Sequence, residues 1–386
     1  MFGSIFIGLS GMNAFSTGLR QISNNITNIN TTGFKSSGLG FADLFGRTNG
    51  QDPGEGHGVA LNDPRLNLAQ GELRQSSRDL DLAIDGSGFL VLLKDGNKFF
   101  SRTGSFEVGS KGFVVLAGTE YQLSVIDASG NPSHISIDAY RTNPPAKTTK
   151  VTFANNLSST ATNFNLPAIA VFDSSGKTDN WQVKFERGTG SPAGEWTVIV
   201  TNGTGTELGR KTLKFNNGII DHSTAKLAFE DTTQDRSVEL DFSTNVTSFS
   251  SGEISTLAAA DVDGYATGEI TAIRVNDKGI LEVAYSNEQN KALGAVTIAD
   301  LRDPQALTQL GSGLFIHKDA SAVDFVTSEH SSVGQVLSRR LEASNVDLSR
   351  EFGDLILVQR GFQASSQVIS ISNDMIQQLF GIRGQG

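Results

Sequence analysis

The chain has 386 residues, with 41 acidic and 31 basic side chains, a formal net charge of −10 and no cysteine. The absence of cysteine excludes a disulfide framework and any thiol chemistry. The acidic balance argues against nucleic acid as a partner, and the lack of a run of about 18 apolar residues argues against membrane insertion. A chain of this length suits roughly two to three domains.

The N-terminal segment, residues 1–29, is predicted to be a helix with an apolar repeat of seven residues. The main row of this repeat and the residues beside it are Ile5, Met12, Leu19 and Ile26, with Leu9, Phe15, Ile22 and Ile29. The spacing is typical of a helix that pairs in a coiled coil. Arg20 is the one ionisable side chain in residues 1–30, so the other faces of this helix are polar but uncharged.

The C-terminal segment, residues 347–386, carries the same repeat. Its main row is Leu348, Leu355, Phe362, Ile369 and Ile376. The row predicted to lie beside it, polar in its middle, is Phe352, Gln359, Ser366, Asn373 and Phe380. Polar seam residues weaken a coiled coil, so both terminal helices are predicted to be disordered in the isolated monomer.

On both helices, the faces away from the apolar rows are polar but uncharged. Such faces can pack against further protein without burying an unpaired charge. The favoured interpretation is a helix pair buried inside an assembly of many copies. An ordinary antiparallel helix pair that closes a domain is the alternative. An interfacial membrane helix fits less well, because such helices carry Lys and Arg on their polar face.

Residues 30–75 are rich in Gly, Asn, Asp and Pro, which predicts an extended connector. Within it, the sequence FADLF at 41–45 is interpreted as one helical turn or an anchoring contact. Strand patterns begin near residue 76, and Asp95-Gly96 predicts a hairpin with a primed turn. The stretch 141–150 contains paired prolines, which cannot continue a ladder, so it predicts a linker.

The inner β domain is predicted to be split by an insertion. Residues 146–261 are rich in Thr, Ser, Asn and Gly, and their closely spaced strands fit a sandwich or barrel. Residues 262–346 resume the pattern of residues 76–145. The expected fold class is therefore α+β and mostly β, with the terminal helices paired as a coiled coil, a split inner β domain and an inserted outer β domain.

Motifs for catalysis or ligand binding are weak in this sequence. The five histidines have no metal-ligand spacing. The sequence GKT at 176–178 ends like a phosphate-binding loop, but Val171 stands where that motif needs Gly, so a hairpin turn explains it better. The sequence DVDG at 261–264 lacks the third ligand and the closing Glu of a calcium loop.

Asp79, Asp81 and Asp85 lie on one predicted strand and are interpreted as its solvated face. An acidic active site there is the less favoured alternative. We therefore expect no enzyme activity, no cofactor and no bound metal.

Both ends of the chain resemble one known family. The N-terminal stretch GLSGMNAFSTGLRQISNNITNINTTGFKSS contains a signature formed by Asn24, Asn25, Ile26, Asn28, Thr31, Gly33, Phe34 and Lys35. The C-terminal stretch LEASNVDLSREFGDLILVQRGFQASSQVI contains a second signature, with Asn345 and Asp347. Together they resemble the flagellar axial proteins, which are the rod, hook and hook-associated subunits. FADLF, DLDLAIDGSGFLVL and AYSNEQNKALGAV are most similar to hook-type members.

The resemblance implies a structural subunit that polymerises into the flagellar hook, a flexible tubular universal joint that transmits motor torque to the filament. A rod or hook-associated subunit is the alternative, although rod subunits generally lack an insertion such as residues 151–261. The implied partners are further copies of the chain, the distal rod, hook cap and hook–filament junction proteins, and the flagellar export apparatus. The start MFGSIFIGLSGMNAF lacks a basic region and a cleavage site, so we expect an extracellular flagellar location reached without a cleaved signal peptide.

Overall fold

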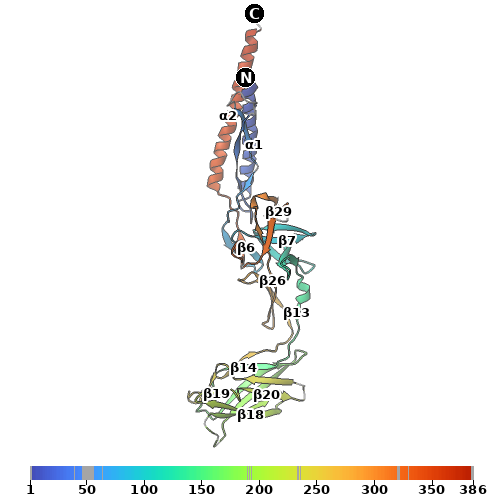
Figure 1. Cartoon of the computed structure of the whole chain (residues 1–386), viewed down its shortest axis with the longest axis vertical. Coiled ribbons are helices and arrows are strands. Elements are labelled where there is room, and N and C mark those ends of the chain that lie inside the picture. Colours follow the sequence, from blue (N-terminus) through green and yellow to red (C-terminus); the bar gives the residue numbers. More distant parts are fainter. Residues whose placement is uncertain are drawn as a thin grey trace. The chain divides into compact units, whose positions relative to one another are not determined.

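The computed structural model describes residues 2–38, 40–45, 56–62, 64–188, 190, 192, 194–232, 234, 236–319, 322–328 and 330–383. Within these residues the chain is mostly β, with one long α-helix near each end (Figure 1). It divides into two compact units. The first comprises Met1–Asp138, Ile273–Val283 and Lys291–Gly386, and the second comprises Ala139–Ala272 and Ala284–Asn290. The finer domain boundaries given above stay a prediction.

The terminal helices belong to the first unit and are α1, Phe2–Thr27, and α2, Leu348–Arg383. They lie side by side and antiparallel (Figure 1). The carboxylate of Asp347 begins α2, because it accepts hydrogen bonds from the backbone N–H of Ser349 at 2.9 Å and of Arg350 at 3.3 Å. These N–H groups have no partner within the helix, and a negative charge there also favours the helix dipole. The prediction of one helix at each end is confirmed.

The first unit is built around a twelve-stranded sheet. Its main path runs β28–β29–β8–β7–β11–β10–β9–β6–β31, with β12 beside β11, β27 beside β7 and β30 beside β27. The strands are β6 (Asp81–Asp85), β7 (Phe89–Lys94), β8 (Asn97–Ser101), β9 (Thr103–Val108), β10 (Val114–Leu116), β11 (Gln122–Ile126), β12 (Pro132–His134), β27 (Ile298–Leu301), β28 (Leu307–Gly311), β29 (Leu314–His317), β30 (Val323–Val326) and β31 (Gln335–Ser338). Phe89, Phe100 and Phe315 are central to one of its apolar clusters.

Two details of this sheet test the sequence analysis. The hairpin at Asp95-Gly96 is confirmed: both residues have positive φ, 49° and 77°, and they join β7 to β8. The solvated acidic face is wrong for Asp81, which is 3% exposed and accepts hydrogen bonds from the hydroxyls of Ser76 and Ser105. β6 is paired on both edges, by β9 and β31, and four successive residues of it are buried, so other parts of the chain cover both of its faces.

The connector contains short strands. They are β1 (Ser37–Gly38), β2 (Phe41–Phe45), β3 (Gly56–Leu61), β4 (Arg65–Leu66) and β5 (Leu73–Gln75), and β5 pairs with β32 (Arg340–Glu342). The helical turn predicted for FADLF is wrong, because these residues form β2 and pair with β3. The anchoring contact is present: the ring of Phe41 lies 5.4 Å from that of Phe15 in α1.

The second unit contains a ten-stranded sheet with the order β15–β16–β17–β18–β19–β22–β14–β21–β20 and β23 beside β14. The strands are β14 (Lys150–Asn156), β15 (Asn163–Phe172), β16 (Thr178–Glu186), β17 (Glu195–Thr201), β18 (Glu207–Asn216), β19 (Ile219–Ile220), β20 (Lys226–Asp231), β21 (Arg236–Asp241), β22 (Val246–Thr247) and β23 (Ala258–Val262). Trp181, Trp196 and Phe153 lie in its core and are at most 1% exposed. The turn predicted at 176–178 is confirmed, since Gly176 has φ 84° and lies between β15 and β16.

The remaining elements are short. A four-stranded sheet has the order β13–β24–β25–β26, and two 3-10 helices occur among the described residues. Their bounds are β13 (Thr142–Asn143), β24 (Gly268–Val275), β25 (Ile280–Tyr285), β26 (Asn290–Ala295), η1 (Ile137–Tyr140) and η2 (Pro304–Ala306).

Candidate self-assembly site

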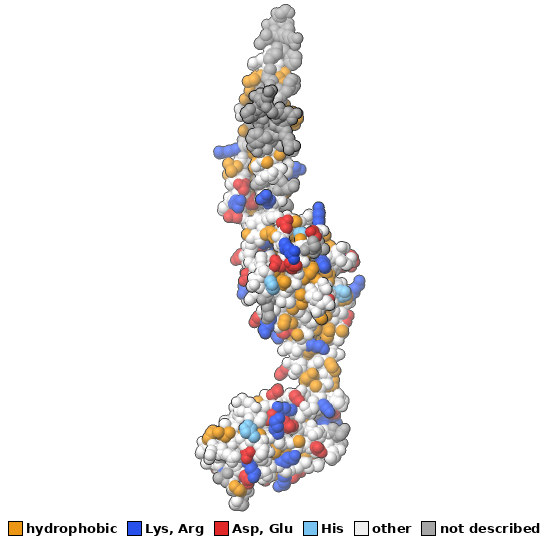
Figure 2. All heavy atoms as spheres, in the orientation of Figure 1, with side chains coloured by type: hydrophobic (Ala, Val, Ile, Leu, Met, Phe, Trp, Pro, Cys, Tyr) orange, Lys and Arg blue, Asp and Glu red, His pale blue; other side chains and the backbone are white. Residues whose placement is uncertain are grey.

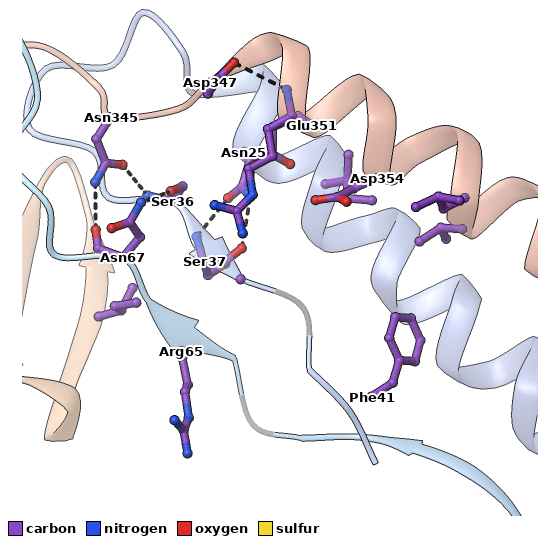
Figure 3. Close-up of a pocket in the computed structure, with 16 residues that line it drawn as sticks. Asn25, Ser36, Ser37, Phe41, Arg65, Asn67, Asn345, Asp347, Glu351 and Asp354 are labelled. Carbon is purple, nitrogen blue, oxygen red and sulfur yellow. Dashed lines mark hydrogen bonds between the residues drawn. The ribbon is translucent and has the colours of Figure 1, made fainter. Parts of the chain in front are cut away.

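Asn25 joins three segments at the base of the helix pair. Its amide donates hydrogen bonds to the carbonyl of Ser37 at 3.0 Å and to Oε1 of Glu351 at 2.9 Å, and its Oδ1 accepts from the N–H of Ser37 at 3.2 Å (Figure 3). Burial raises the pKa of the Glu351 carboxyl, and the hydrogen bond from Asn25 opposes that shift. Both ends of the Asn25 amide are therefore used to hold α1, the connector and α2 together.

Asn345 makes a second link between the two ends of the chain. Its Oδ1 accepts a hydrogen bond from the N–H of Ser36 at 2.8 Å, and its Nδ2 donates to the carbonyls of Asn67 at 2.7 Å and Ala69 at 2.8 Å. An amide suits this position because it supplies a donor and an acceptor at once. Asn345 thus ties the strand that leads into α2 to two stretches of the connector.

Lys35 and Arg102 share one buried carboxylate, that of Glu342. Lys35 Nζ lies 2.6 Å from Oε1 and Arg102 Nε lies 3.2 Å from Oε2, and each of the three side chains is at most 1% exposed. The Arg102 guanidinium also donates to backbone carbonyls of the turn between β6 and β7. Burial lowers the pKa of Lys35, and the charge of Glu342 opposes the shift. A buried set of this kind is strongly destabilised when one partner is removed.

Three further signature residues close the end of α1. The amide of Asn28 donates to the carbonyl of Asn24 at 2.8 Å, and its Oδ1 accepts from the hydroxyl of Thr31 at 3.0 Å. The carbonyl of Asn24 also accepts a hydrogen bond from the backbone N–H of Asn28 at 3.3 Å, so Asn28 is held to the last turn of α1 by both its main chain and its side chain.

Gly33 and Phe34 begin the connector. Gly33 has φ 70°, and its N–H donates to the carbonyl of Glu342 at 2.8 Å. A side chain there would be strained and would lie 2.9 Å from Cγ2 of Thr103. Phe34 is 6% exposed. The signature residues Asn25, Asn28, Gly33, Phe34 and Lys35 therefore make the turn from α1 into the β region.

Glycines allow α1 and α2 to approach closely. A Cβ added at Gly8 would lie 2.7 Å from Cγ1 of Ile369, and one at Gly11 would lie 2.6 Å from Oγ of Ser365. A Cβ at Gly361 would overlap the ring of Phe15. The α1 side of this seam consists of two rows at seven-residue spacing, Gly8, Phe15 and Ile22, and Gly11, Gly18 and Asn25.

The row of α2 predicted to lie beside its main row is wrong. Phe352 is 50% exposed, and the other described members, Gln359, Ser366 and Asn373, are also exposed; the side chain of Phe380 lies outside the described residues. The row that packs toward α1 lies on the other side and comprises Glu351, Val358, Ser365 and Ser372. Small and polar residues are favoured there because α1 presents glycines and Asn25.

The remaining predicted assembly residues divide between the seam and the surface. Ile22 is buried, and the half-buried ones are Ile5, Met12, Ile26, Ile29, Leu355, Ile369 and Ile376. The exposed ones are Leu9, Leu19, Leu348, Phe352 and Phe362. The seven-residue repeat therefore describes two surfaces, one between the helices and one that faces outward.

Large apolar side chains are concentrated on the outside of the helix pair. Among the described residues, twelve of the eighteen exposed large apolar side chains lie on α1 and α2. They are Phe6, Ile7, Leu9, Leu19, Leu348, Phe352, Ile356, Leu357, Phe362, Val368, Ile371 and Met375. Part of this surface is visible in Figure 2 as hydrophobic side chains on the helices. An exposed apolar surface of this extent marks an interaction site.

A cavity of about 520 Å³ lies at the base of the helix pair (Figure 3). Its lining includes Phe41, Arg65, Asp354 and Leu357, so apolar groups and charges of both signs meet there. No group of three or more His, Cys, Asp or Glu that could hold a metal ion occurs in the described part of the chain. None of the described helices is long and apolar enough to cross a membrane.

Sequence reasoning missed Glu342, Arg102 and Glu351. The contacts between Arg102 and Glu342, Lys35 and Glu342, and Asn25 and Glu351 span 240, 307 and 326 residues, so no sequence spacing relates the partners. The glycine row of α1 could have been predicted from the sequence, since Gly11, Gly18 and Asn25 follow the same seven-residue spacing as the apolar rows.

Family models match both ends of the chain. The model described as Flagella basal body rod protein matches residues 5–35, and the model described as Flagellar basal body rod FlgEFG protein C-terminal matches residues 337–382. These ranges contain the seam of the helix pair and the residues from Asn25 to Lys35 and from Glu342 to Asp347. The chain thus has the terminal elements that flagellar rod and hook subunits share.

Comparison over the full length of the chain favours the hook subunits over the rod subunits. The flagellar hook protein FlgE of Salmonella typhimurium is 30% identical, over 97% of this chain and 98% of the relative. The FlgE proteins of Escherichia coli K12 and Treponema pallidum are 29% and 26% identical, over 97% and 99% of this chain and 98% and 100% of the relatives. The chain therefore belongs to the flagellar hook protein family, FlgE, and is a structural hook subunit of the flagellum.

The fold is also similar to a solved structure. The crystal structure of Helicobacter pylori flagellar hook protein FlgE2 superimposes with a TM-score of 0.52, at 12% identity, over 71% of this chain and 100% of that chain. At this identity the match concerns the fold alone, which is mostly β in both.

Proposed function

We propose that copies of this chain polymerise through α1 and α2 into the tubular hook. The observation that carries the proposal is the apolar outer surface of the helix pair. Residues 352–381 contain three ionisable side chains, Asp354, Arg360 and Asp374, and residues 1–30 contain one, Arg20. A helix pair whose outer side faced water would carry more charge there. Neighbouring copies would remove this apolar surface from water.

In the polymer the helices act as a two-stranded coiled coil that lines the inside of the tube, with the split β domain and the inserted block outside it. The glycine contacts at Gly8, Gly11 and Gly361 support close pairing of α1 with α2. The links made by Asn25, Asn345 and Glu342 support a fixed junction between the end of α1, the connector and the start of α2. Distal rod, hook cap and hook–filament junction proteins would meet the two ends of the tube, and subunits would reach it through the flagellar export apparatus.

A change at Phe362 tests the role of the helices. Phe362→Asp places a charge on an apolar surface that polymerisation would bury, at a cost of several kcal/mol, so we expect no filaments. Val108→Asp is the matched control, because Val108 on β9 is also 41% exposed. In both variants, the circular dichroism and the thermal unfolding of the β domains should be the same as in the unsubstituted chain. Normal filaments from Phe362→Asp, seen by electron microscopy, would rule out the proposed inner core.

The inserted block is proposed to bias the curvature of the tube, so that it works as a universal joint. The retained ends are adjacent, because the N–H of Asp263 donates to the carbonyl of Lys150 at 3.2 Å, so residues 151–261 can be deleted and the ends joined by a short linker. Export and polymerisation should persist, and the hooks should be straight or differently curved, with poor motility. A deletion variant that cannot polymerise would show that the block makes essential contacts between subunits.

A further inference from the structure

The helix pair has a second apolar seam on α2. The residues of the second α2 seam are Leu357, Ala364, Val368, Ile371 and Met375, which with Gly361 follow a spacing of four and three residues. All five side chains are exposed, and that of Leu357 is 68% exposed. A 4-3 spacing of apolar and small residues is the pattern that receives another helix. The first such seam of α2 is occupied by α1, and the second faces outward.

An apolar groove lies across α1. The α1 groove is lined by Phe6, Leu9, Met12, Ser16 and Phe362, with the polar side chains of Ser10 and Asn13 beside them, and encloses about 600 Å³. Its walls contain no ionisable side chain. A groove of this kind admits apolar side chains from a partner and offers no charge that burial would leave unpaired.

Helical geometry separates the second seam from the part of the groove that α2 contributes. Leu357 precedes the buried Val358 by one residue, which turns it about 100° away from α1. Phe362, which lines the groove, follows Val358 by four residues, which turns it about 40° in the other sense. On α1 the groove extends across the outer face from Met12 to Ser10, whose Oγ also accepts a hydrogen bond from the N–H of Val59. The two surfaces share no residue.

The start of the second α2 seam carries a charge of each sign. Asp354 lies seven residues before Gly361 and Arg350 seven residues before Leu357, whereas Arg20 lies four residues after Ser16 of the α1 groove. Within the described part of the chain, neither Arg20 nor Asp354 is in an ion pair. A copy that brought its second seam to the groove of another could therefore offer Asp354 as a partner for Arg20, in addition to the apolar contact.

We infer that the second α2 seam of one copy docks in the α1 groove of the next copy. This inference rests on the proposed function and names the surfaces that carry it. The two surfaces differ and share no residue, so each copy can use one toward each of two neighbours. Contacts of this heterologous kind do not close on themselves unless a rotation forces a ring, and they generate helical polymers.

The absence of native cysteine allows a direct test. Ser16→Cys reports on the groove, and Leu357→Cys, Ala364→Cys and Ile371→Cys report on successive turns of the second seam. The groove variant is mixed with each seam variant, polymerised and mildly oxidised, so that every disulfide joins two copies. We expect mixed dimers on non-reducing gels from at least one combination, and none from a single variant alone or from dilute monomer.

Polymers that form, as judged by sedimentation and microscopy, but yield no mixed dimers, or yield same-surface dimers, overturn the docking inference and leave the proposed function standing. Failure of the unsubstituted chain to polymerise overturns both. An independent measurement is the critical concentration for polymerisation. Val368→Asp should raise it at least tenfold and its off-seam neighbour Gln367→Asp less than twofold; equal values for the two variants contradict the inference.

Discussion

The helix pair and the ten-stranded β sheet of the second unit differ in where their large apolar side chains lie. In the sheet, Trp181, Trp196 and Phe153 lie in a closed core, and charged side chains form pairs at the surface, such as Lys184 with Glu186. In the helix pair, the seam combines glycines and serines with a few buried apolar residues such as Ile22 and Val358, and twelve large apolar side chains of the described residues are exposed on the outside. The sheet therefore completes its core within one chain, whereas the helix pair needs neighbouring copies to complete one.

The largest expected effect of this difference is in limited proteolysis. In dilute monomer, protease should remove both terminal helices and leave a core near residues 75–345. Ordering about 60 helical residues costs on the order of 1–2 kcal/mol each in backbone entropy, which the narrow seam of a single pair does not offset. In the polymer the same sites should be protected. Helices that resist protease in dilute monomer would contradict the comparison.

The next effect concerns the junction below the helices. Glu342→Ala leaves Lys35 and Arg102 buried without a carboxylate, so the first unit should lose about 3–5 kcal/mol of stability in urea unfolding. The transition of the second unit should not move. Glu72→Ala is the control: Glu72 pairs with Arg74 at the surface, with 72% of its side chain exposed, and should cost less than about 1 kcal/mol. A Glu342→Ala loss as small as that of the control would mean that the buried charges are not structurally important.

A smaller effect tests the glycine seam. Gly361→Ala puts a methyl group against the ring of Phe15, and the overpacking should cost about 1–3 kcal/mol of helix pairing. Gly353→Ala is the matched control on the same helix, because nothing lies within 4 Å of its added Cβ; it should gain up to about 1 kcal/mol from helix propensity. The readout is the temperature at which polymers dissociate. If both variants shift it in the same direction, the seam is not closely packed.

The smallest effect is a difference in pH dependence. Burial raises the pKa of Glu351 above its ordinary 4.5, so the cost of burying its charge should fall as the pH decreases through its folded value. The critical concentration for polymerisation should therefore be lower near pH 4.5 than at pH 8. Glu351→Gln keeps an acceptor for Asn25 and should remove the dependence. An unchanged dependence would assign it to other groups.

In the second unit the sign is reversed. Burial alone would raise the pKa of Asp241, but hydrogen bonds from Lys150 and Ser243 hold it at about 2, below its ordinary 3.8. Its contribution to stability is therefore present above pH 3.8 and is lost as the pH falls toward 2. Acid unfolding of the sheet, followed by tryptophan fluorescence, should begin only below about pH 4. Asp241→Asn should flatten the curve in that range.

Several features of this protein were determined by its sequence alone. The two helices followed from seven-residue periodicity, and the turns at Asp95-Gly96 and Gly176 followed from the need for positive φ. These signals are local, because hydrogen bonds within a few residues and the steric limits on φ decide them. The class of protein could also be recognised from the sequence, since the residues from Asn24 to Lys35 form one continuous signature.

Only the tertiary structure decided which row of each helix faces its partner. Periodicity finds apolar rows but does not rank them, and the glycines that set the closest approach have no apolar signal of their own. It also decided that Asp81 is buried and that Glu342 serves two cations, one of them 307 residues away. Burial and ion pairing depend on which distant segments the fold brings together, and no local spacing records that choice.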